Sequence, residues 1–289
     1  MKPALIVIII LVVVIGIFAA RNIYELHHLN IVNYRLTSKK VSPENSLKAV
    51  FLTDLHGRRY GENNRTLLKL VAKQKPDVIL TGGDMVTASD RTDFPESIQL
   101  FQDLMKIAPV YSIPGNHEKR MNQPGEPTHR AFLAYKEELI ENGVNYMEND
   151  SVSLNSQITL SGLDIDPTYY NKIRRNFYLP EQMKKDLAEV DRTRFNIVLA
   201  HNPRFFSTYA GSGADLFLAG HYHGGAVRIG KHVGVVSPQF VPFPKYTRGM
   251  YKKDDTAMIV SAGCGSHKVN LRLFNQPEIV VLEIHGNLV

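Results

Sequence analysis

Short apolar runs that each end in small and polar residues recur along this chain, and this unit limits the possible folds more than any other feature. The runs lie at residues 47–54, 76–84, 108–118, 194–203 and 214–225. Stretches at 64–74 and 97–107, with apolar residues at three- and four-residue spacing, separate the first three runs and are typical of amphipathic helices. The alternation of strand and helix predicts an α/β fold with a largely parallel sheet.

Further strand-like runs lie at 156–164, 256–265 and 277–286. This number of strands predicts two sheets with helices outside them. The segments 119–135, 165–193 and 236–253 are rich in Pro, Tyr, Arg and Asn. We expect them to be loops, which often carry the specificity of a scaffold.

The length of 289 residues fits one large domain or two small ones. The 34 Lys and Arg residues exceed the 28 Asp and Glu residues, which gives a net charge of +6. This charge mildly favours phosphorylated molecules, nucleic acid or a membrane surface as partners, although it is also ordinary for a soluble protein. The single cysteine, Cys264, excludes an internal disulfide.

The N-terminal segment is apolar enough to cross a membrane. Residues 4–20 carry no charge and no strongly polar group, and Arg21 ends the run; a spanning helix needs about 17–25 residues. A cleaved signal peptide is the alternative, but cleavage after Ala20 would place the bulky Phe18 where small residues are usual. We therefore expect an uncleaved anchor.

These features predict a transmembrane anchor at 1–22, a polar connector at 23–46 and the main domain at 47–289. Residues 23–36 would form either an amphipathic helix on the membrane surface or a plain linker helix. The orientation stays open. The positive residues that follow the span favour a cytoplasmic main domain, whereas a short basic start before a long apolar run is also typical of an export signal.

The polar residues at the ends of the runs are of a particular kind. They are Asp54 and His56, Asp84, Asn116 and His117, His201, and His221 and His223. Because ligands of open α/β sheets bind beyond the carboxyl ends of the strands, we expect these side chains to converge. In an extended segment residues i and i+2 face the same side, so each closely spaced pair can point into one cavity.

Nitrogen and oxygen donors without a thiolate suit Mn, Fe, Zn, Co or Ni. Seven such ligands are too many for one tetrahedral ion, but they suit two divalent ions that share a ligand, and Asp84 is the natural bridging carboxylate. Two ions about 3.5–4 Å apart stabilise the attacking and leaving oxygens of a phosphoryl displacement. Two aspartates and a bridging hydroxide leave part of the charge of two divalent ions uncompensated, so the site would attract phosphate.

In this order, the motifs D-x-H, GD, GNHE, H and GH-x-H resemble the signature of the calcineurin-like metallophosphoesterases, over about residues 47–286. The resemblance implies a four-layer α/β/β/α sandwich with a two-metal site. It implies that Asp54, His56 and His223 hold one ion, that Asn116, His201 and His221 hold the other, and that Asp84 bridges them. His117 would be the non-ligand histidine that stabilises the transition state or protonates the leaving oxygen.

The anchor, the compact domain and the tail SAGCGSHKVNLRLFNQPEIVVLEI are similar to a membrane-associated subgroup of this family. That subgroup includes enzymes that hydrolyse the pyrophosphate of UDP-2,3-diacylglucosamine. In the tail, His267 and Arg272 would either reach the substrate or lie in a solvated loop. Arg58 and Arg59 follow the first motif and are better candidates for phosphate contacts, Arg58 being the substrate-binding residue that we predict.

The sequence thus predicts a membrane-anchored hydrolase with two divalent metal ions. It would cleave a phosphodiester or pyrophosphate through a metal-bridging hydroxide, a phosphomonoester being an open alternative, and the substrate would be lipid- or nucleotide-linked. A non-catalytic metal-binding scaffold is one alternative, which the complete set of motif residues argues against. A nuclease is another, but the basic residues are scattered where a nuclease needs a basic groove, so nucleic acid is not favoured as a partner.

Overall fold

The computed structural model describes residues 3–89, 94–171, 176–187, 189–230, 233–237, 241–266 and 270–286. The helices are α1 (Pro3–His27), α2 (Arg65–Gln74), α3 (Phe94–Met105), α4 (Asn116–Met121), α5 (His129–Glu141), α6 (Pro180–Asp186) and α7 (Phe206–Tyr209). The strands are β1 (Asn30–Ser38), β2 (Leu47–Leu52), β3 (Val78–Thr81), β4 (Val110–Ser112), β5 (Asn145–Tyr146), β6 (Ser151–Ser153), β7 (Ile158–Leu163), β8 (Phe195–Ala200), β9 (Leu216–Ala219), β10 (Arg228–Ile229), β11 (Val233–Gly234), β12 (Gly249–Lys253), β13 (Thr256–Val260) and β14 (Glu278–Gly286).

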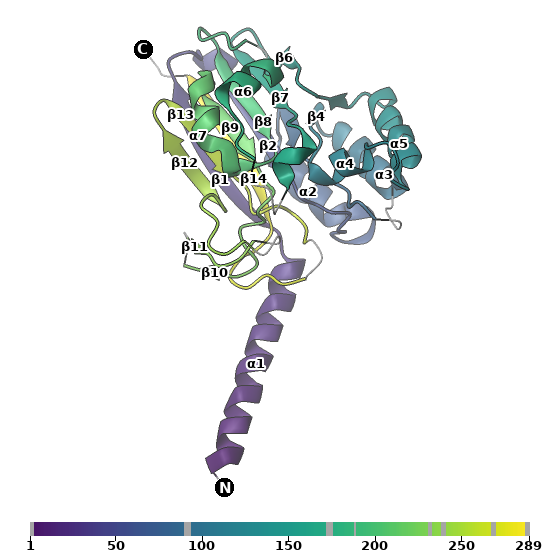
Figure 1. Ribbon diagram of the computed structural model, residues 1–289, viewed down its shortest axis with the longest axis vertical. Helices are drawn as coiled ribbons and strands as arrows, with labels where there is room; N and C mark the ends of the chain where they lie inside the picture. Colours follow the sequence, from purple (N-terminus) through teal and green to yellow (C-terminus); the bar gives the residue numbers. More distant parts are fainter. Residues whose placement is uncertain are drawn as a thin grey trace.

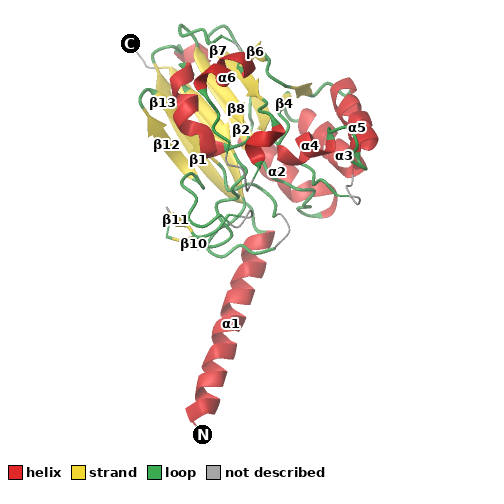
Figure 2. Cartoon of the chain, in the orientation of Figure 1, coloured by secondary structure: helices red, strands yellow, loops and turns green. Residues whose placement is uncertain are grey.

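Two six-stranded sheets lie face to face at the centre of the domain (Figures 1 and 2). The first has the order β1-β14-β2-β3-β4-β5 and the second the order β12-β13-β9-β8-β7-β6. Strands β2 to β5 run parallel, as do β7, β8, β9 and β13. The largely parallel organisation expected from the alternating runs is therefore confirmed.

Three apolar clusters separate the layers. One packs the first sheet against α2, α3 and α5, with Phe101 and Phe132 fully buried. The second fills the space between the sheets, where Phe51 and Leu218 meet. The third packs the second sheet, through Phe217, against α6 and α7. The layers thus follow the order α/β/β/α, as the resemblance implied.

The segment predicted to be a connector, 23–46, is largely part of the folded domain. Its first residues continue α1, and Asn30–Ser38 forms β1, which pairs in parallel with β14 at the edge of the first sheet. Tyr34 and Leu36 lie two residues apart on one face of β1 and pack into the core between the sheets. The prediction of a single helix over residues 23–36 is therefore wrong beyond the end of α1.

Two of the segments expected to be loops contain helices. Helix α5 begins within residues 119–135 and buries Phe132 and Tyr135 against the first sheet, and α6 lies within residues 165–193. These helices bury only one face, and their outer faces carry polar residues. The high polar content of the segments therefore suggested loops.

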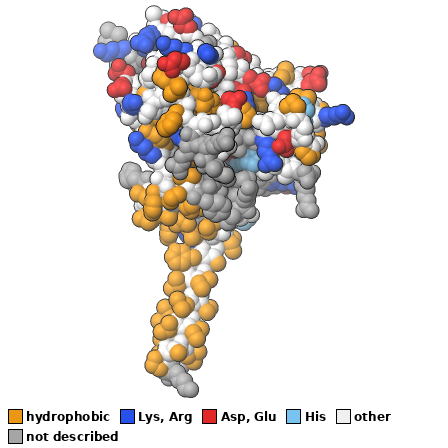
Figure 3. Space-filling view, in the orientation of Figure 1, with side chains coloured by type: hydrophobic (Ala, Val, Ile, Leu, Met, Phe, Trp, Pro, Cys, Tyr) orange, Lys and Arg blue, Asp and Glu red, His pale blue; other side chains and the backbone are white. Residues whose placement is uncertain are grey.

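Helix α1 extends away from the domain (Figure 1), and Figure 3 shows hydrophobic side chains along its length. It has 25 residues, and its most apolar window has a mean hydropathy of 3.2 with none of it buried. At a rise of about 1.5 Å per residue it is longer than the hydrocarbon core of a bilayer, which is about 30 Å thick. By length and composition it can span a membrane, and an N-terminal signal sequence passes the same test.

Candidate metal centre

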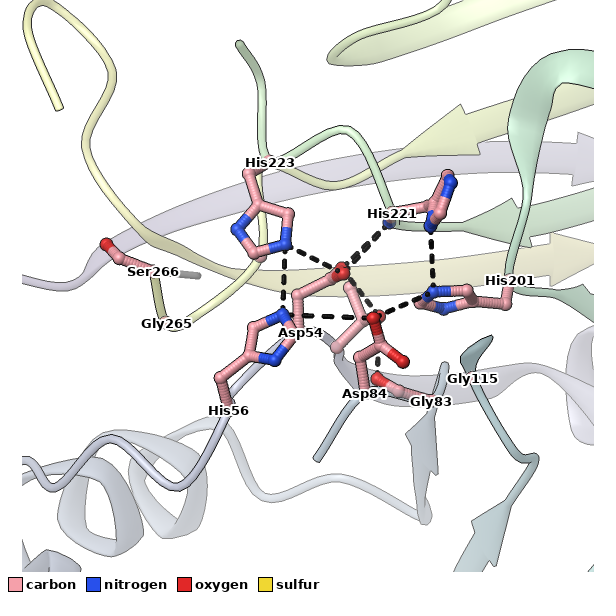
Figure 4. Close-up of polar contacts among 12 residues, drawn as sticks. Asp54, His56, Gly83, Asp84, Gly115, His201, His221, His223, Gly265 and Ser266 are labelled. Atoms are coloured by element: carbon pink, nitrogen blue, oxygen red, sulfur yellow. Dashed lines mark hydrogen bonds and ion pairs between the residues drawn. The ribbon is translucent and has the colours of Figure 1, made fainter. Parts of the chain in front are cut away.

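The ends of five parallel strands meet where the two sheets open, and the predicted site residues follow these ends. Asp54 and His56 follow β2, Asp84 follows β3, Asn116 and His117 begin α4 after β4, His201 follows β8, and His221 and His223 follow β9. Figure 4 shows the two aspartates between one pair of histidines on each side. All eight predicted residues therefore lie at one place in the structure.

The side chains form three overlapping groups of possible metal ligands. Asp54, His56 and His223 make the first group, Asp84, His201 and His221 make the second, and His56, Asp84 and His117 make a third that overlaps the first two; in each group the ligand atoms lie within 4.8 Å of one another. Nε2 of His56 lies 3.1 Å from Nε2 of His223 and 3.8 Å from Oδ2 of Asp84. Asp84 therefore lies between the first two groups, where a bridging ligand is expected.

Most of the candidate ligands lie on unusual backbone. Asp54, His56, Asp84, His221 and His223 have φ between 49° and 70°, in the left-handed region. This conformation is uncommon for residues other than glycine and costs of order 1–3 kcal/mol at each position. Because the strain recurs at five candidate ligand positions, we infer that these loop conformations serve to place the side chains at the candidate metal site.

Glycines make room for the two carboxylates. A Cβ on Gly220 would lie 2.1 Å from Oδ2 of Asp54, and a Cβ on Gly115 would lie 2.3 Å from Oδ1 of Asp84. In their place, backbone amides donate to the carboxylates: His221 N–H to Asp54 at 3.0 Å and His117 N–H to Asp84 at 2.8 Å. The carboxylates are thus held by backbone from neighbouring strands.

The tautomer of His201 is determined by its surroundings. Its Nδ1 lies 2.7 Å from the carbonyl oxygen of Gly82, which can only accept, so Nδ1 carries a proton. Its Nε2 therefore faces Oδ2 of Asp84 at 3.3 Å and Nδ1 of His221 at 3.2 Å. Burial alone would lower the pKa of His201, but the Asp84 carboxylate raises it to about 9. The site thus favours a positive charge at this point.

The other groups are held in the forms that bind metal. Burial, together with His201, lowers the pKa of His221 to about 3, so this imidazole is neutral at physiological pH. Burial raises the pKa of Asp54, but His223 outweighs this effect, and His201 does the same for Asp84, so both pKa values lie below the usual range. Neutral imidazoles and ionised carboxylates are the ligand forms that metal binding requires.

The carboxamide of Asn116 also indicates a cation. With its oxygen turned toward Asp84 and His221, it faces only acceptors, Oδ2 of Asp84 at 3.3 Å and Nδ1 of His221 at 2.8 Å. With the amide reversed, its nitrogen would donate to both. A metal ion between these groups favours the first orientation, because an amide oxygen binds cations and an amide nitrogen does not.

The donor set therefore fits two divalent ions. Two ligands at right angles around an ion with bonds of about 2.1 Å are about 3 Å apart. The contacts among His56, His223, His201 and His221 of 3.1 Å and 3.2 Å have this spacing. A hydrogen bond between the two rings of a pair has the same length, so the spacing suits an ion without requiring one.

His117 lies beside the first two groups with one nitrogen already used. Its Nδ1 accepts the backbone N–H of Ala88 at 2.9 Å, so a neutral His117 carries its proton on Nε2. Its ring meets that of His56 edge to face, with 5.0 Å between the centroids. Burial lowers its pKa. The imidazole is therefore oriented as a neutral Nε2–H donor.

Glu118 is a positioning residue; the sequence placed it among the polar residues after the third run, expected to converge with the others, but gave it no role of its own. It is 3% exposed, and its carboxylate accepts four backbone N–H groups, from Asp84, Met85, Val86 and Gly115. It therefore ties the turn that carries Asp84 to the start of α4. The sequence signal for this role was its place in the GNHE motif, directly after Asn116 and His117. A glutamate buried there needs hydrogen-bond donors, and the backbone supplies them.

A pocket of about 430 Å³ opens beside the second group of ligands. Its lining comprises Tyr169, Tyr170, Asn171, Asn202, Arg204, His221, Tyr222, Val241, Pro242, Phe243, Pro244, Lys245 and Tyr246. The ring of Tyr170 contacts that of His221 edge to face at 5.3 Å. Parts of the segments 165–193 and 236–253, expected to carry specificity, thus lie next to the candidate metal site.

Of the predicted substrate-contact residues, Arg58 stays a prediction and Arg272 has another role. Arg58 stacks on the ring of Tyr60 at 5.7 Å and lines a small hollow with Leu55 and Asn64, away from the pocket beside His221. Arg272 is 2% exposed, and its guanidinium donates to backbone carbonyls, including those of Ala262 and Asn275. Both predictions for Arg272, a substrate contact and a solvated loop, are therefore wrong. Its partner in that prediction, His267, lies outside the described residues.

The sequence model of one family matches this chain over residues 47–225, and that family is described as calcineurin-like phosphoesterase. The match covers more than half of the chain and contains the whole candidate site. The chain belongs to the calcineurin-like phosphoesterase family. It is therefore a hydrolase of the metallophosphoesterase type.

Relatives span nearly the whole chain. An uncharacterized protein of Bacillus subtilis, YpbG, is 26% identical over 90% of this chain and 88% of its own length. The phosphodiesterase YaeI of Escherichia coli is 28% identical over 82% of each chain. A solved dimetal phosphatase from Danio rerio matches with 13% identity and a TM-score of 0.42, over 75% of this chain and 87% of that one. Other solved structures that match are longer, and the chain covers 49% and 56% of two of them.

Proposed function

We propose that this phosphoesterase binds two divalent ions and hydrolyses a phosphodiester or pyrophosphate. Asp54, His56 and His223 would hold one ion, Asn116, His201 and His221 would hold the other, and Asp84 would contact both. Two such ions supply an activated water molecule and neutralise the charge of the phosphate oxygens. The identity of the metals is left to experiment, among Mn, Fe, Zn, Co and Ni.

Side chains of the protein would stabilise the transition state and bind the substrate. Hydrolysis forms a bond from water oxygen to phosphorus and breaks the bond to the leaving oxygen, which needs a proton. The attacking water would release that proton, and neutral His117, whose Nδ1 accepts the N–H of Ala88, would donate a hydrogen bond from Nε2–H to the charged oxygens of the transition state. Arg204 and Lys245 in the pocket beside His221 would bind further negative charge of the substrate.

The observation that carries this proposal is the convergence of histidine nitrogens and carboxylates in the candidate site. Two pairs of histidine nitrogens lie 3.1 Å and 3.2 Å apart around two ionised aspartates, in loops held in left-handed conformation. A scaffold without catalysis would not need His117 held as an Nε2–H donor beside this cluster. Nucleic acid is not the partner that we favour, because the pocket is a compact hollow and no long basic groove adjoins it in the described structure.

Turnover of bis(p-nitrophenyl) phosphate by the full chain loaded with Mn²⁺ tests the proposal. We expect His117→Ala to lower kcat by about 10²–10⁴-fold with the metal content unchanged, as measured by inductively coupled plasma mass spectrometry. His285→Ala is the matched control, because this histidine is exposed and lies in β14. Equal turnover by wild type and His117→Ala, with two ions bound to each, would refute the role of His117.

The same assay can compare pyrophosphates with diesters and monoesters. A pyrophosphate of the UDP-diacylglucosamine type belongs among the substrates, because the tail of the chain is similar to enzymes that cleave it. Turnover restricted to phosphomonoesters would contradict the proposed substrate class.

We also propose that α1 is retained as a membrane anchor and that the boundary between this anchor and the rest of the chain falls near residue 22. The side chain of Asn22 donates to the carbonyl of Asn270 at 3.1 Å, and Glu25 accepts the N–H of Asn275 at 2.9 Å. A helix so joined to the domain supports an anchor better than a removable leader. Mass spectrometry of the mature N-terminus tests this, and a chain that begins at Arg21 would refute it.

A further inference from the structure

Four exposed apolar side chains lie on segments that backbone hydrogen bonds join at the base of the domain, next to α1. We call Ile229, Val233, Phe243 and Phe274 the collar; they are 65%, 42%, 65% and 52% exposed. Ile229 pairs with Val233 in the β10–β11 hairpin, and the N–H of Phe243 donates to the carbonyl of Val235, just after β11. Figure 3 shows hydrophobic side chains gathered where the domain meets the helix.

Phe274, the fourth collar residue, is joined to the β10–β11 hairpin through its neighbour Leu273. The N–H of Leu273 donates to the carbonyl of Ala226 at 3.0 Å, and the N–H of Arg228 donates to the carbonyl of Leu273 at 2.9 Å. Phe274 therefore lies beside the strand that carries Ile229. Isolated exposed apolar residues are common, but a connected apolar patch indicates an interaction site.

The position of the collar relative to a bilayer follows from its contact with α1, the candidate membrane span. The ring of Phe274 meets the ring of Phe18 edge to face, with 6.4 Å between the centroids. Phe18 lies inside the apolar run of α1, before the first charge at Arg21. Because Phe274 touches the helix within its apolar run, a bilayer that holds α1 must also reach Phe274.

The domain is tied to α1 in one orientation. Oδ1 of Asn22 accepts the N–H of Arg272 at 2.7 Å, and the buried Glu25 accepts the N–H of Asn275 at 2.9 Å. These bonds lie on either side of Phe274 in the sequence. They hold the collar against the end of the span, so the position of the helix sets the position of the collar.

Two collar residues lie on strained backbone. Phe243 has φ 43° and Phe274 has φ 58°. The left-handed region is a true outlier for bulky residues, and here it directs aromatic side chains outward. Burial of these rings in lipid would offset that strain.

We propose that the collar inserts into the bilayer that holds α1, and that the pocket beside His221 receives the polar end of a membrane-resident phosphodiester or pyrophosphate. Phe243 belongs both to the collar and to the lining of that pocket, so the pocket opens at the bilayer surface. Arg204 and Lys245 line it as well, and among the described residues neither is paired with a carboxylate. The substrate class rests on the proposed function, whereas the insertion of the collar does not.

The absence of tryptophan from the chain allows a direct test of insertion. Phe243→Trp and Phe274→Trp place single tryptophans in the collar of the full chain, reconstituted in phosphatidylcholine vesicles with brominated acyl chains. Phe18→Trp is the positive control within the span, and Leu133→Trp on α5, 44% exposed and away from α1 (Figure 1), is the negative control. We expect bromine to quench the collar and span tryptophans and to leave the control on α5 unquenched. Quenching at residue 18 without quenching at residues 243 and 274 would overturn the insertion.

Two substrates with the same leaving group test the substrate class. One is soluble bis(p-nitrophenyl) phosphate, and the other is phosphatidyl-p-nitrophenol embedded in the vesicles. We expect Ile229→Thr with Phe274→Asn, at positions outside the pocket, to lower turnover of the lipid by about tenfold or more, because two apolar side chains no longer leave water. Turnover of the soluble diester should stay unchanged.

The outcomes separate the two proposals. Wild-type turnover of the soluble diester alone would overturn the lipid substrate and leave the proposed function standing. No turnover of either substrate with two ions bound would overturn the proposed function, and the quenching experiment would then decide the insertion of the collar by itself.

Discussion

Replacement of Glu118 by glutamine probes how the loops around the candidate metal site are held. Oε2 accepts the N–H groups of Asp84 at 2.9 Å and Gly115 at 3.0 Å, and Oε1 accepts those of Met85 at 2.8 Å and Val86 at 3.2 Å. Glutamine has one acceptor oxygen, so its NH₂ group faces two backbone donors in either orientation. Two buried N–H groups then lose their acceptor.

The expected cost follows from these two donors. Each buried polar group left without a partner costs about 1–3 kcal/mol, which gives about 2–6 kcal/mol for Glu118→Gln. For a domain of this size, 1 kcal/mol shifts the melting temperature by about 2–4 °C, so we expect a decrease of about 5–20 °C. Because the affected turn carries Asp84, we also expect weaker binding of the second metal equivalent.

Thermal melts followed by circular dichroism, with the full chain in detergent, measure the change. Glu141→Gln is the matched control, since Glu141 is exposed on α5 and the same charge is removed. We expect the control to melt within about 2 °C of wild type, because an exposed substitution changes stability little. If Glu118→Gln also melts within that range, the four-donor account of the carboxylate is wrong.

Three further predictions concern the ions and the loops that hold them. Chelation by EDTA should lower the melting temperature by about 5–10 °C, because ions that bind only the folded state stabilise it; an unchanged melt would contradict metal binding. His221→Ala and His223→Ala should each lose about one of two bound equivalents in elemental analysis, while loss of both from either variant would contradict two separate groups. Asn275→Asp places a buried carboxylate against the carbonyls of His223 and Gly225 and should destabilise the fold by about 3–5 kcal/mol, which a urea titration measures.

The candidate ligands could be predicted from the sequence because the motif residues lie just after short apolar runs. Parallel strands of one sheet bring their carboxyl ends to one edge, so Asp54 and Asp84 had to meet once β2 and β3 formed. His201 joins them because the second sheet, which contains β8, packs against the first. The sequence also predicted that His221 and His223 serve different ions, and the structure places the two histidines in different groups of candidate ligands. Their roles as ligands stay predictions that the metal analyses above decide.

Other features depend on contacts between distant segments, which local patterns do not contain. Strand β1 is a strand because β14, at the other end of the chain, pairs with it. Glu118 positions a turn because four backbone donors from two loops converge on its carboxylate. The pocket beside His221 and the collar likewise combine segments that are far apart in sequence.

The sequence by itself determined the alternation of strands and helices around the motifs, the chemistry of the site residues and an apolar span, since each depends on residue type and short-range spacing. Only the tertiary structure decided that Arg272 is a buried support, that His117 carries its proton on Nε2, and that Phe274 lies against Phe18. The physical reason is that tautomers, burial and depth depend on which atoms become neighbours after folding, and these neighbours come from different layers of the sandwich.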